Sequence, residues 1–135
     1  MERTTRDALH RAREAEKEQA LFYGALASQA EAAGDAATAE RLSGLHADEQ
    51  HHLSRLSARL LELGESLADL RSVATPAARL EGWESVARER EAREVERCRA
   101  LLELDLDPET EALVREILDV EELHREQLGG KWMRA

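Results

Sequence analysis

The amino-acid sequence predicts an all-α protein that folds as a four-helix bundle. Alanine, leucine, glutamate and arginine dominate the composition, whereas the chain contains only two prolines and four aromatic residues. Such a composition is typical of long helices rather than of sheet. Apolar residues also recur at intervals of three and four positions along four separate stretches, each bounded by turn-forming residues. We expect one domain over residues 1–135, which is long enough to bury a core without disulfides.

The first two predicted helices are separated by a short turn. The first is expected over residues 5–33 and ends at Gly34, because glycine suits the left-handed conformation that follows many helix ends. Asp35 can then cap the second helix, expected over residues 36–63, by accepting hydrogen bonds from its first amide groups. Gly64 ends this helix in the same manner. Together these two helices form the first predicted hairpin.

The last two predicted helices form the second hairpin. Pro76 precedes the third helix, expected over residues 77–104, and fits a first helical turn because it lacks an amide hydrogen. The fourth helix is expected over residues 108–128, with Asp107 as its cap and acidic residues in its first turn. Two glycines follow it, and residues 131–135 form a short tail.

A long connection joins the two predicted hairpins. Residues 65–75 exceed the usual length of a turn in a helix bundle. Fully extended, this segment reaches about 35–40 Å, close to the length of a helix of about 25 residues. We therefore expect a crossover that returns the chain to the other end of the bundle and joins two antiparallel hairpins. A simple up-down-up-down topology stays open, because any helical turn within the segment shortens its reach.

Charge and cysteine content exclude several kinds of partner. The formal net charge of −10, with basic residues interspersed among acidic ones, argues against nucleic acid and favours a cation. The chain has neither an apolar signal segment nor a long uncharged run, so we expect no export and no membrane insertion. Cys98 is the only cysteine, which excludes an internal disulfide and a Cys-x-x-Cys metal centre. A reducing, cytoplasmic location is therefore expected.

Two Glu-x-x-His pairs lie on the apolar stripes of the second and fourth predicted helices. They are Glu49 with His52 and Glu121 with His124. Residues three apart on a helix project from the same side, so each pair offers one carboxylate and one imidazole to a metal ion. A single pair is weak evidence, because glutamate is abundant in this chain. Two pairs on apolar stripes indicate a di-metal site, since buried charge is costly unless it is neutralised.

Each pair has a glutamate partner on the preceding predicted helix. In an antiparallel hairpin, residues equally distant from the turn lie at the same height. Counting back from Glu121 through the turn gives Glu91. Counting back from Glu49 gives the neighbourhood of Glu16 to Glu18, of which Glu16 lies on the apolar stripe of the first helix. Two divalent cations would neutralise these four carboxylates. Oxygen and nitrogen donors without thiolate suit two iron ions, with manganese or a mixed iron and manganese pair as alternatives, although affinity order alone would favour zinc or copper.

Several stretches resemble the ferritin-like di-iron superfamily, in particular the erythrin branch to which the rubrerythrins belong. They are Glu16 with Tyr23 seven residues on, Ala39-x-x-Leu-x-x-Leu45 leading into Asp48-Glu49-Gln50-His51-His52, Glu91, Asp107-Pro108-Glu109, and Val120-Glu121-Glu122-Leu123-His124. The resemblance covers almost the whole chain. It implies a ferritin-like bundle whose metal ligands are Glu16, Glu49, His52, Glu91, Glu121 and His124.

The resemblance implicates further residues near the metals. Glu94 matches an additional carboxylate of rubrerythrin-type sites, which exchanges with a histidine when iron changes oxidation state. Tyr23 could support a ligand carboxylate through its hydroxyl, whereas Cys98 occupies the corresponding place in the second half of the chain. Only one tyrosine is therefore expected near the metals.

The expected activity is that of a di-iron oxidoreductase, a peroxidase or ferroxidase that reacts with peroxide or dioxygen. No rubredoxin-like cysteine centre follows the helices, so a separate electron donor is expected. The superfamily also implies a homodimer. Three alternatives stay open: manganese catalase-like disproportionation of peroxide, iron storage or delivery, and a metal-free structural helical bundle. Metal analysis, turnover with an added reductant, and the response of stability to chelation separate these alternatives.

Overall fold

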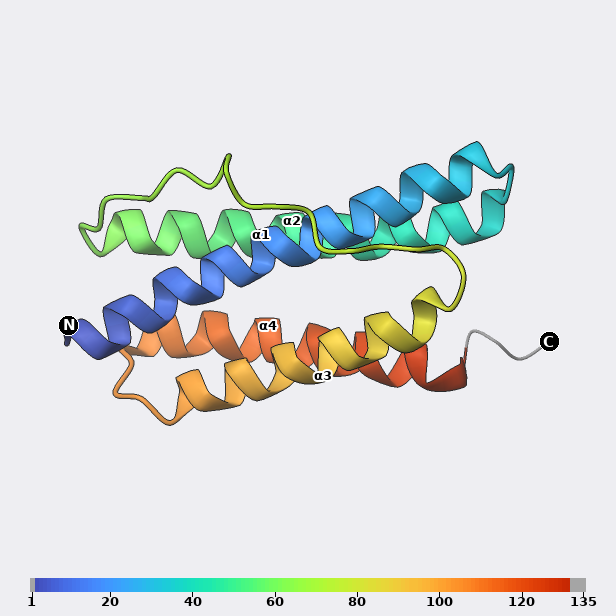
Figure 1. The fold of residues 1–135 in the computed structure, drawn as a ribbon. Coiled ribbons are helices and arrows are strands. Elements are labelled where there is room, and N and C mark those ends of the chain that lie inside the picture. The colour runs from blue at the N-terminus through green and yellow to red at the C-terminus, as the bar shows by residue number, and fades with distance from the viewer. Residues whose placement is uncertain (1, 132–135) are drawn as a thin grey trace. The chain divides into compact units, whose positions relative to one another are not determined.

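A computed structural model describes residues 2–131 of the chain (Figure 1). Its regular structure consists of four α-helices and one π-helical turn, and residues 2–131 contain no strand. The bounds are α1 (Arg3–Ala32), α2 (Ala36–Glu62), α3 (Trp83–Leu102), α4 (Pro108–Glu126) and the π-helical turn η1 (Gln127–Lys131). The predicted all-α class is confirmed, and four helices are compatible with a four-helix bundle. Residues 132–135 of the predicted tail lie outside the described residues.

Contacts divide the chain into two compact units. The first unit is Arg11–Trp83, which contains most of α1, all of α2 and the connection to α3. The second unit consists of the described residues on either side of that segment, and it contains α3 and α4. The expectation of a single domain over residues 1–135 stays a prediction.

Within the first unit, α1 and α2 run in opposite directions. Arg13 Nε donates a hydrogen bond to Ser57 Oγ at 2.8 Å, and His46 Nδ1 lies 2.8 Å from the Ala20 carbonyl oxygen. Gly24 allows this close approach, because a Cβ at that position would lie only 3.1 Å from His46 Cε1. As residue numbers rise along α1, the numbers of their α2 partners fall, so the two helices are antiparallel.

The turn between α1 and α2 has the predicted chemistry. Gly34 adopts φ +75°, a conformation that residues with a Cβ rarely adopt. The Asp35 carboxylate accepts hydrogen bonds from the Thr38 backbone N–H at 3.1 Å and from the Thr38 hydroxyl at 2.7 Å. The hydroxyl bond first, and then the backbone bond, holds the pKa of Asp35 below its ordinary value. The prediction that Asp35 caps the second helix is confirmed.

The predicted cap of the fourth helix is also confirmed. Asp107 precedes α4, and Pro108 occupies the first helical turn. The Asp107 carboxylate accepts hydrogen bonds from the Thr110 backbone N–H at 2.9 Å and from the Thr110 hydroxyl at 2.7 Å. Thr110 itself is fully buried, so the two hydrogen bonds of this cap lie at a buried helix start.

We expect Asp107→Ala to lower the free energy of unfolding by about 1 kcal/mol, because the first amide groups of α4 lose their acceptor. Asp107→Asn is the matched control and should retain most of the stability, since asparagine caps helices about as well as aspartate. Urea denaturation of both variants measures the difference. Equal loss in the two variants would show that charge, rather than hydrogen bonding, stabilises this helix end.

The third helix begins later than predicted. α3 starts at Trp83, so the prediction that it begins at Ala77 is wrong. Gly82, immediately before it, has φ +70°, which is incompatible with a right-handed helix running through this position. The Leu80 backbone N–H donates to Gln29 Oε1 at 3.1 Å instead of entering a helical ladder. A tertiary contact therefore overrides the local preference for helix in this segment.

The connection between α2 and α3 runs back along α1. Near its start, Arg13 Nη1 donates to the Ala68 carbonyl oxygen at 2.9 Å, and further on Gln29 Nε2 donates to the Ala78 carbonyl oxygen at 2.8 Å. Arg13 and Gln29 lie about 24 Å apart along the axis of a helix. Figure 1 shows the connection as a green-to-yellow segment that passes along α1 and α2. The chain thus returns from the end of α2 to the end at which α2 begins.

Within the second unit, α3 and α4 also run in opposite directions. Arg99 Nη2 lies 3.7 Å from Glu122 Oε1, and a Cβ at Gly129 would lie 3.7 Å from Arg88 Nε. α4 ends at Glu126, two residues before the predicted end of the fourth helix, and the π-helical turn η1 follows it. Leu128 within this turn is buried.

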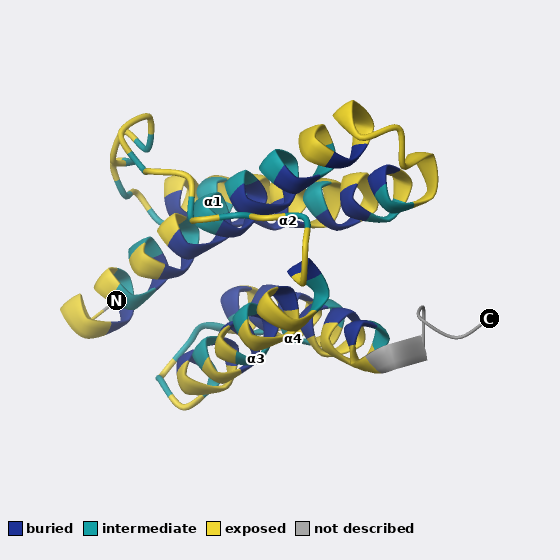
Figure 2. Cartoon of the chain, turned by 45° about the vertical axis from the view of Figure 1, so that its right-hand side comes forward, coloured by how far each residue is buried: buried dark blue, intermediate teal, exposed yellow. Residues whose placement is uncertain are grey.

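Buried residues form stripes along the helices, as Figure 2 shows in dark blue. On α2 they recur at intervals of three and four positions, as a half-buried helix requires. These positions are Ala39, Leu42, Leu45, Glu49, His52, Leu56 and Leu60. The α4 stripe has the same spacing and contains Leu113, Ile117, Glu121 and His124. None of the helices in residues 2–131 has the length and apolar character needed to cross a membrane.

Candidate metal centre

The six side chains predicted as metal ligands are all buried. Their exposed fractions range from 0% to 4%: Glu16 2%, Glu49 0%, His52 4%, Glu91 0%, Glu121 0% and His124 2%. Acidic side chains are rarely buried to this extent without a compensating charge. An isolated buried carboxylate costs several kcal/mol, so a group of four carboxylates calls for a cationic partner.

The first triad consists of Glu16 on α1 and of Glu49 and His52 on α2. His52 Nδ1 lies 3.5 Å from Glu16 Oε2 and 3.5 Å from Glu49 Oε1. The ligand atoms of the three residues lie within 4.8 Å of one another. The antiparallel course of α1 and α2 brings Glu16 beside the Glu-x-x-His pair. All three residues belong to the first unit.

The second triad repeats this arrangement with Glu91 on α3 and with Glu121 and His124 on α4. His124 Nδ1 lies 3.5 Å from Glu91 Oε1 and 3.7 Å from Glu121 Oε1. Its ligand atoms likewise lie within 4.8 Å of one another, and all three residues belong to the second unit. Each unit therefore contains a triad of two buried carboxylates and one buried imidazole in the same order along the chain.

The separations within each triad suit ligands that share a metal ion. Distances of 3.5 and 3.7 Å are too long for hydrogen bonds between an imidazole nitrogen and a carboxylate. Two ligand atoms bound to one ion at about 2.1 Å, about 90–120° apart, are separated by about 3.0–3.6 Å. In addition, no hydrogen-bond donor in residues 2–131 satisfies the buried Oε2 of Glu16. The two buried Glu/His clusters could hold metal ions.

Helical register explains why these side chains are buried while their neighbours are not. On α2, His52 is 4% exposed, whereas the adjacent His51 belongs to the exposed residues. On α4, Glu121 is fully buried, whereas the adjacent Glu122 is exposed and lies beside Arg99. His52 and Glu121 therefore each have an exposed neighbour of the same residue type, because successive helical positions are rotated by about 100°.

Tyr23 lies on the same stripe of α1 as Glu16 and is fully buried. Its ring packs edge-on against Phe22, with the ring centroids 5.3 Å apart. Cys98, its counterpart in the second half of the sequence, is also buried. The supporting role expected of the Tyr23 hydroxyl stays a prediction.

Glu94 is buried but does not join the second triad. Its exposed fraction is 5%, and its Oε1 accepts a hydrogen bond from Arg97 Nη1. This ion pair was not predicted from the sequence, although a glutamate and an arginine three residues apart on a helix are a recognisable signal. Gln19, to which the sequence pattern gave no role, is fully buried one turn after Glu16.

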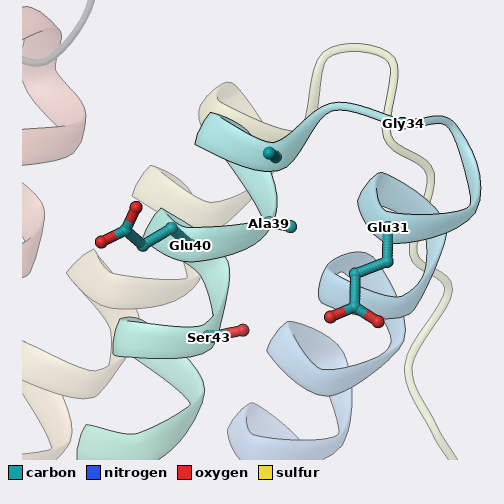
Figure 3. A pocket seen from close by; sticks show the side chains of 6 residues that line it. Glu31, Gly34, Ala39, Glu40 and Ser43 are labelled. Atoms are coloured by element: carbon teal, nitrogen blue, oxygen red, sulfur yellow. The ribbon is translucent and has the colours of Figure 1, made fainter.

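A separate groove lies where α1 and α2 meet, near their connecting turn. It has a volume of about 470 Å³ and is lined by Glu31, Gly34, Ala36, Ala39, Glu40 and Ser43. Figure 3 shows Glu31 on α1 and Glu40, Ala39 and Ser43 on α2. Glu31 and Glu40 are exposed, and no histidine or cysteine lines the groove. The groove therefore lacks the buried, mixed donor set that distinguishes the triads.

Comparisons with known proteins identify no relative. No protein-family profile, no curated protein and no solved structure matches the chain. The chemistry of the site must therefore be argued from its own residues.

Proposed function

We propose that each triad binds one iron ion and that the protein is a di-iron oxidoreductase. The observation that supports this proposal most strongly is the burial of a Glu/Glu/His triad in each unit. Two divalent ions would bring four positive charges to four carboxylates. Neutral imidazoles would add one nitrogen donor to each ion. The donor set contains no thiolate, which suits iron or manganese better than a zinc site of the structural type.

In this proposal the bundle is of the ferritin-like, rubrerythrin type. Two features support that assignment. In each triad one glutamate, Glu16 or Glu91, comes from one helix, and the Glu-x-x-His pair comes from the next helix. This is the ligand pattern of di-iron carboxylate bundles. The connection that returns along α1 has the course expected of a crossover between two hairpins. An up-down-up-down bundle would need only a short turn at this place.

The chain's own residues would supply charge compensation, orientation and exclusion of water. The four carboxylates of Glu16, Glu49, Glu91 and Glu121 would hold the ions and offset their charge. Burial of all six ligands keeps bulk water from the reacting groups. When bound, two ferrous ions would each give one electron to hydrogen peroxide, which takes up two protons and leaves as two waters. Dioxygen is the alternative oxidant.

A separate electron donor would complete the cycle. Cys98 is the only cysteine and is buried, so the chain has no cysteine centre of its own that could receive electrons. A small reductant or an electron-transfer protein would return both ions to the ferrous state. With no such donor, oxidation would stop after one equivalent of peroxide per pair of ions.

Anaerobic titration of the ferrous protein with peroxide tests this proposal. We expect ferric absorption to rise linearly and to stop at one peroxide per two irons. Glu49→Ala and Glu121→Ala should each abolish the absorption change, because each removes a ligand from one triad. Loading with manganese is the comparison: steady release of dioxygen from peroxide would favour the catalase-like alternative. Absence of any oxidation in the iron-loaded protein would contradict a redox function.

A further inference from the structure

The two halves of the chain differ one helical turn after the first glutamate of each triad. Gln19 follows Glu16 by three residues, whereas Glu94 follows Glu91 by three residues. Residues at this spacing lie on the same side of a helix, with about 5–6 Å between their Cβ atoms. Both positions are buried, with exposed fractions of 0% for Gln19 and 5% for Glu94. The first half thus has a neutral amide where the second half has an additional carboxylate.

Arg97 compensates this additional carboxylate. Its Nη1 donates to Glu94 Oε1, while the Arg97 side chain is 39% exposed and the Glu94 side chain 7% exposed. The guanidinium thus reaches inward from the surface and forms a charge-assisted hydrogen bond with a buried acid. Without this pairing, Glu94 would add a third buried negative charge to the unit that already contains the buried Glu91 and Glu121.

Arg97 makes the net charge of the buried acidic residues equal in the two halves of the chain. Glu91, Glu94 and Glu121 carry three negative charges, and Arg97 reduces the sum to two. Glu16 and Glu49, with the neutral Gln19 beside them, also carry two. Both halves therefore present the charge that one divalent ion neutralises.

We propose that Arg97 is a positioning residue that determines metal specificity in the second triad. By holding the Glu94 carboxylate, it limits the triad to two carboxylates and one imidazole, a donor set matched to a divalent ion. When Arg97 is removed, Glu94 becomes a third carboxylate ligand, and the triad then favours ions of higher charge. This inference rests on the proposed metal binding of the second triad.

Titration of the metal-free protein with Mn²⁺ and with Tb³⁺ tests the inference, with terbium luminescence and competition as readouts. We expect Arg97→Gln to raise the affinity for Tb³⁺ relative to Mn²⁺ by about 10–100-fold, the range by which groups beside metal ligands alter affinity. Arg97→Lys should preserve the wild-type ratio, because it keeps the positive charge. Arg99→Gln is the surface control, since Arg99 is exposed and lies beside the exposed Glu122.

Glu94→Gln tests separately whether Glu94 binds the ion in the wild type. Because Arg97 already holds Glu94 away from the ion, Glu94→Gln should leave the wild-type affinities within about twofold and should cancel the effect of Arg97→Gln in the double variant. A large loss of Mn²⁺ affinity in Glu94→Gln would show that Glu94 is already a ligand and would overturn the inference, as would an unchanged ratio in Arg97→Gln. Failure of the wild type to bind either ion would instead overturn the proposed function.

Discussion

Loading the metal-free protein with ferrous ion should raise its free energy of unfolding by about 5 kcal/mol and its Tm by about 15 °C. The reason is that an ion held by a folded triad stabilises the native state by about 2.7 kcal/mol at a hundredfold excess over its Kd, and two triads are present. Relief of repulsion among the buried carboxylates contributes to the metal affinity on which this increase depends. Differential scanning calorimetry under anaerobic conditions, before and after addition of a chelator, measures the effect.

The adjacent histidines of α2 provide a control for this prediction. His52 is buried in the first triad, whereas His51 is exposed. We expect His52→Ala to lose about half of the metal-dependent increase in Tm, because only the first triad is affected, and His51→Ala to retain it. An equal response in the two variants would mean that the stabilising ion binds elsewhere.

Substitution of Glu121 by glutamine should lower the rate of peroxide-dependent iron oxidation at least about 100-fold. The change keeps the size of the side chain but removes a buried charged ligand of the second triad, which is a larger perturbation than the loss of a group beside a ligand. Stopped-flow absorption after mixing the ferrous protein with peroxide gives the rate.

Glu122→Gln is the matched control, because Glu122 is the next residue on α4 but is exposed. Its rate should stay within about twofold of the wild type, since its ion pair with Arg99 lies at the surface and contributes little. If both variants lost activity equally, the effect would come from the net charge of the helix and not from the triad.

The buried stripes and helix caps could be predicted from sequence because they depend on local rules. Leucines at three- and four-residue spacing identify the buried face of α2, and the break in this stripe at Glu49 and His52 marks the candidate ligands. Asp35 and Asp107 both cap helices as expected, because an aspartate three residues before a free amide is a short-range pattern. Counting through the turn places Glu91 beside His124, and counting together with the apolar stripe of α1 places Glu16 beside His52.

The remaining features depend on contacts between distant residues. The late start of α3 follows from the hydrogen bonds of Gln29 to Ala78 and Leu80, which lie about 50 positions further along the chain. The π-helical turn η1 was likewise not predicted, because two glycines follow Leu128 in the sequence. Arg97 and Glu94 are only three residues apart, but α3 contains many other charged residues at the same spacing. Which of these pairs includes a buried carboxylate could not be predicted from the spacing alone.

The metal content of the protein after anaerobic reloading with ferrous ion tests the central claim most directly. Elemental analysis should find two irons per chain in the wild type, about one in Glu49→Ala or Glu121→Ala, and none when both triads are disrupted. A wild-type protein that retains no metal, and whose unfolding is unaffected by chelator, would contradict the account and would leave a helical bundle whose buried polar groups only pair with one another.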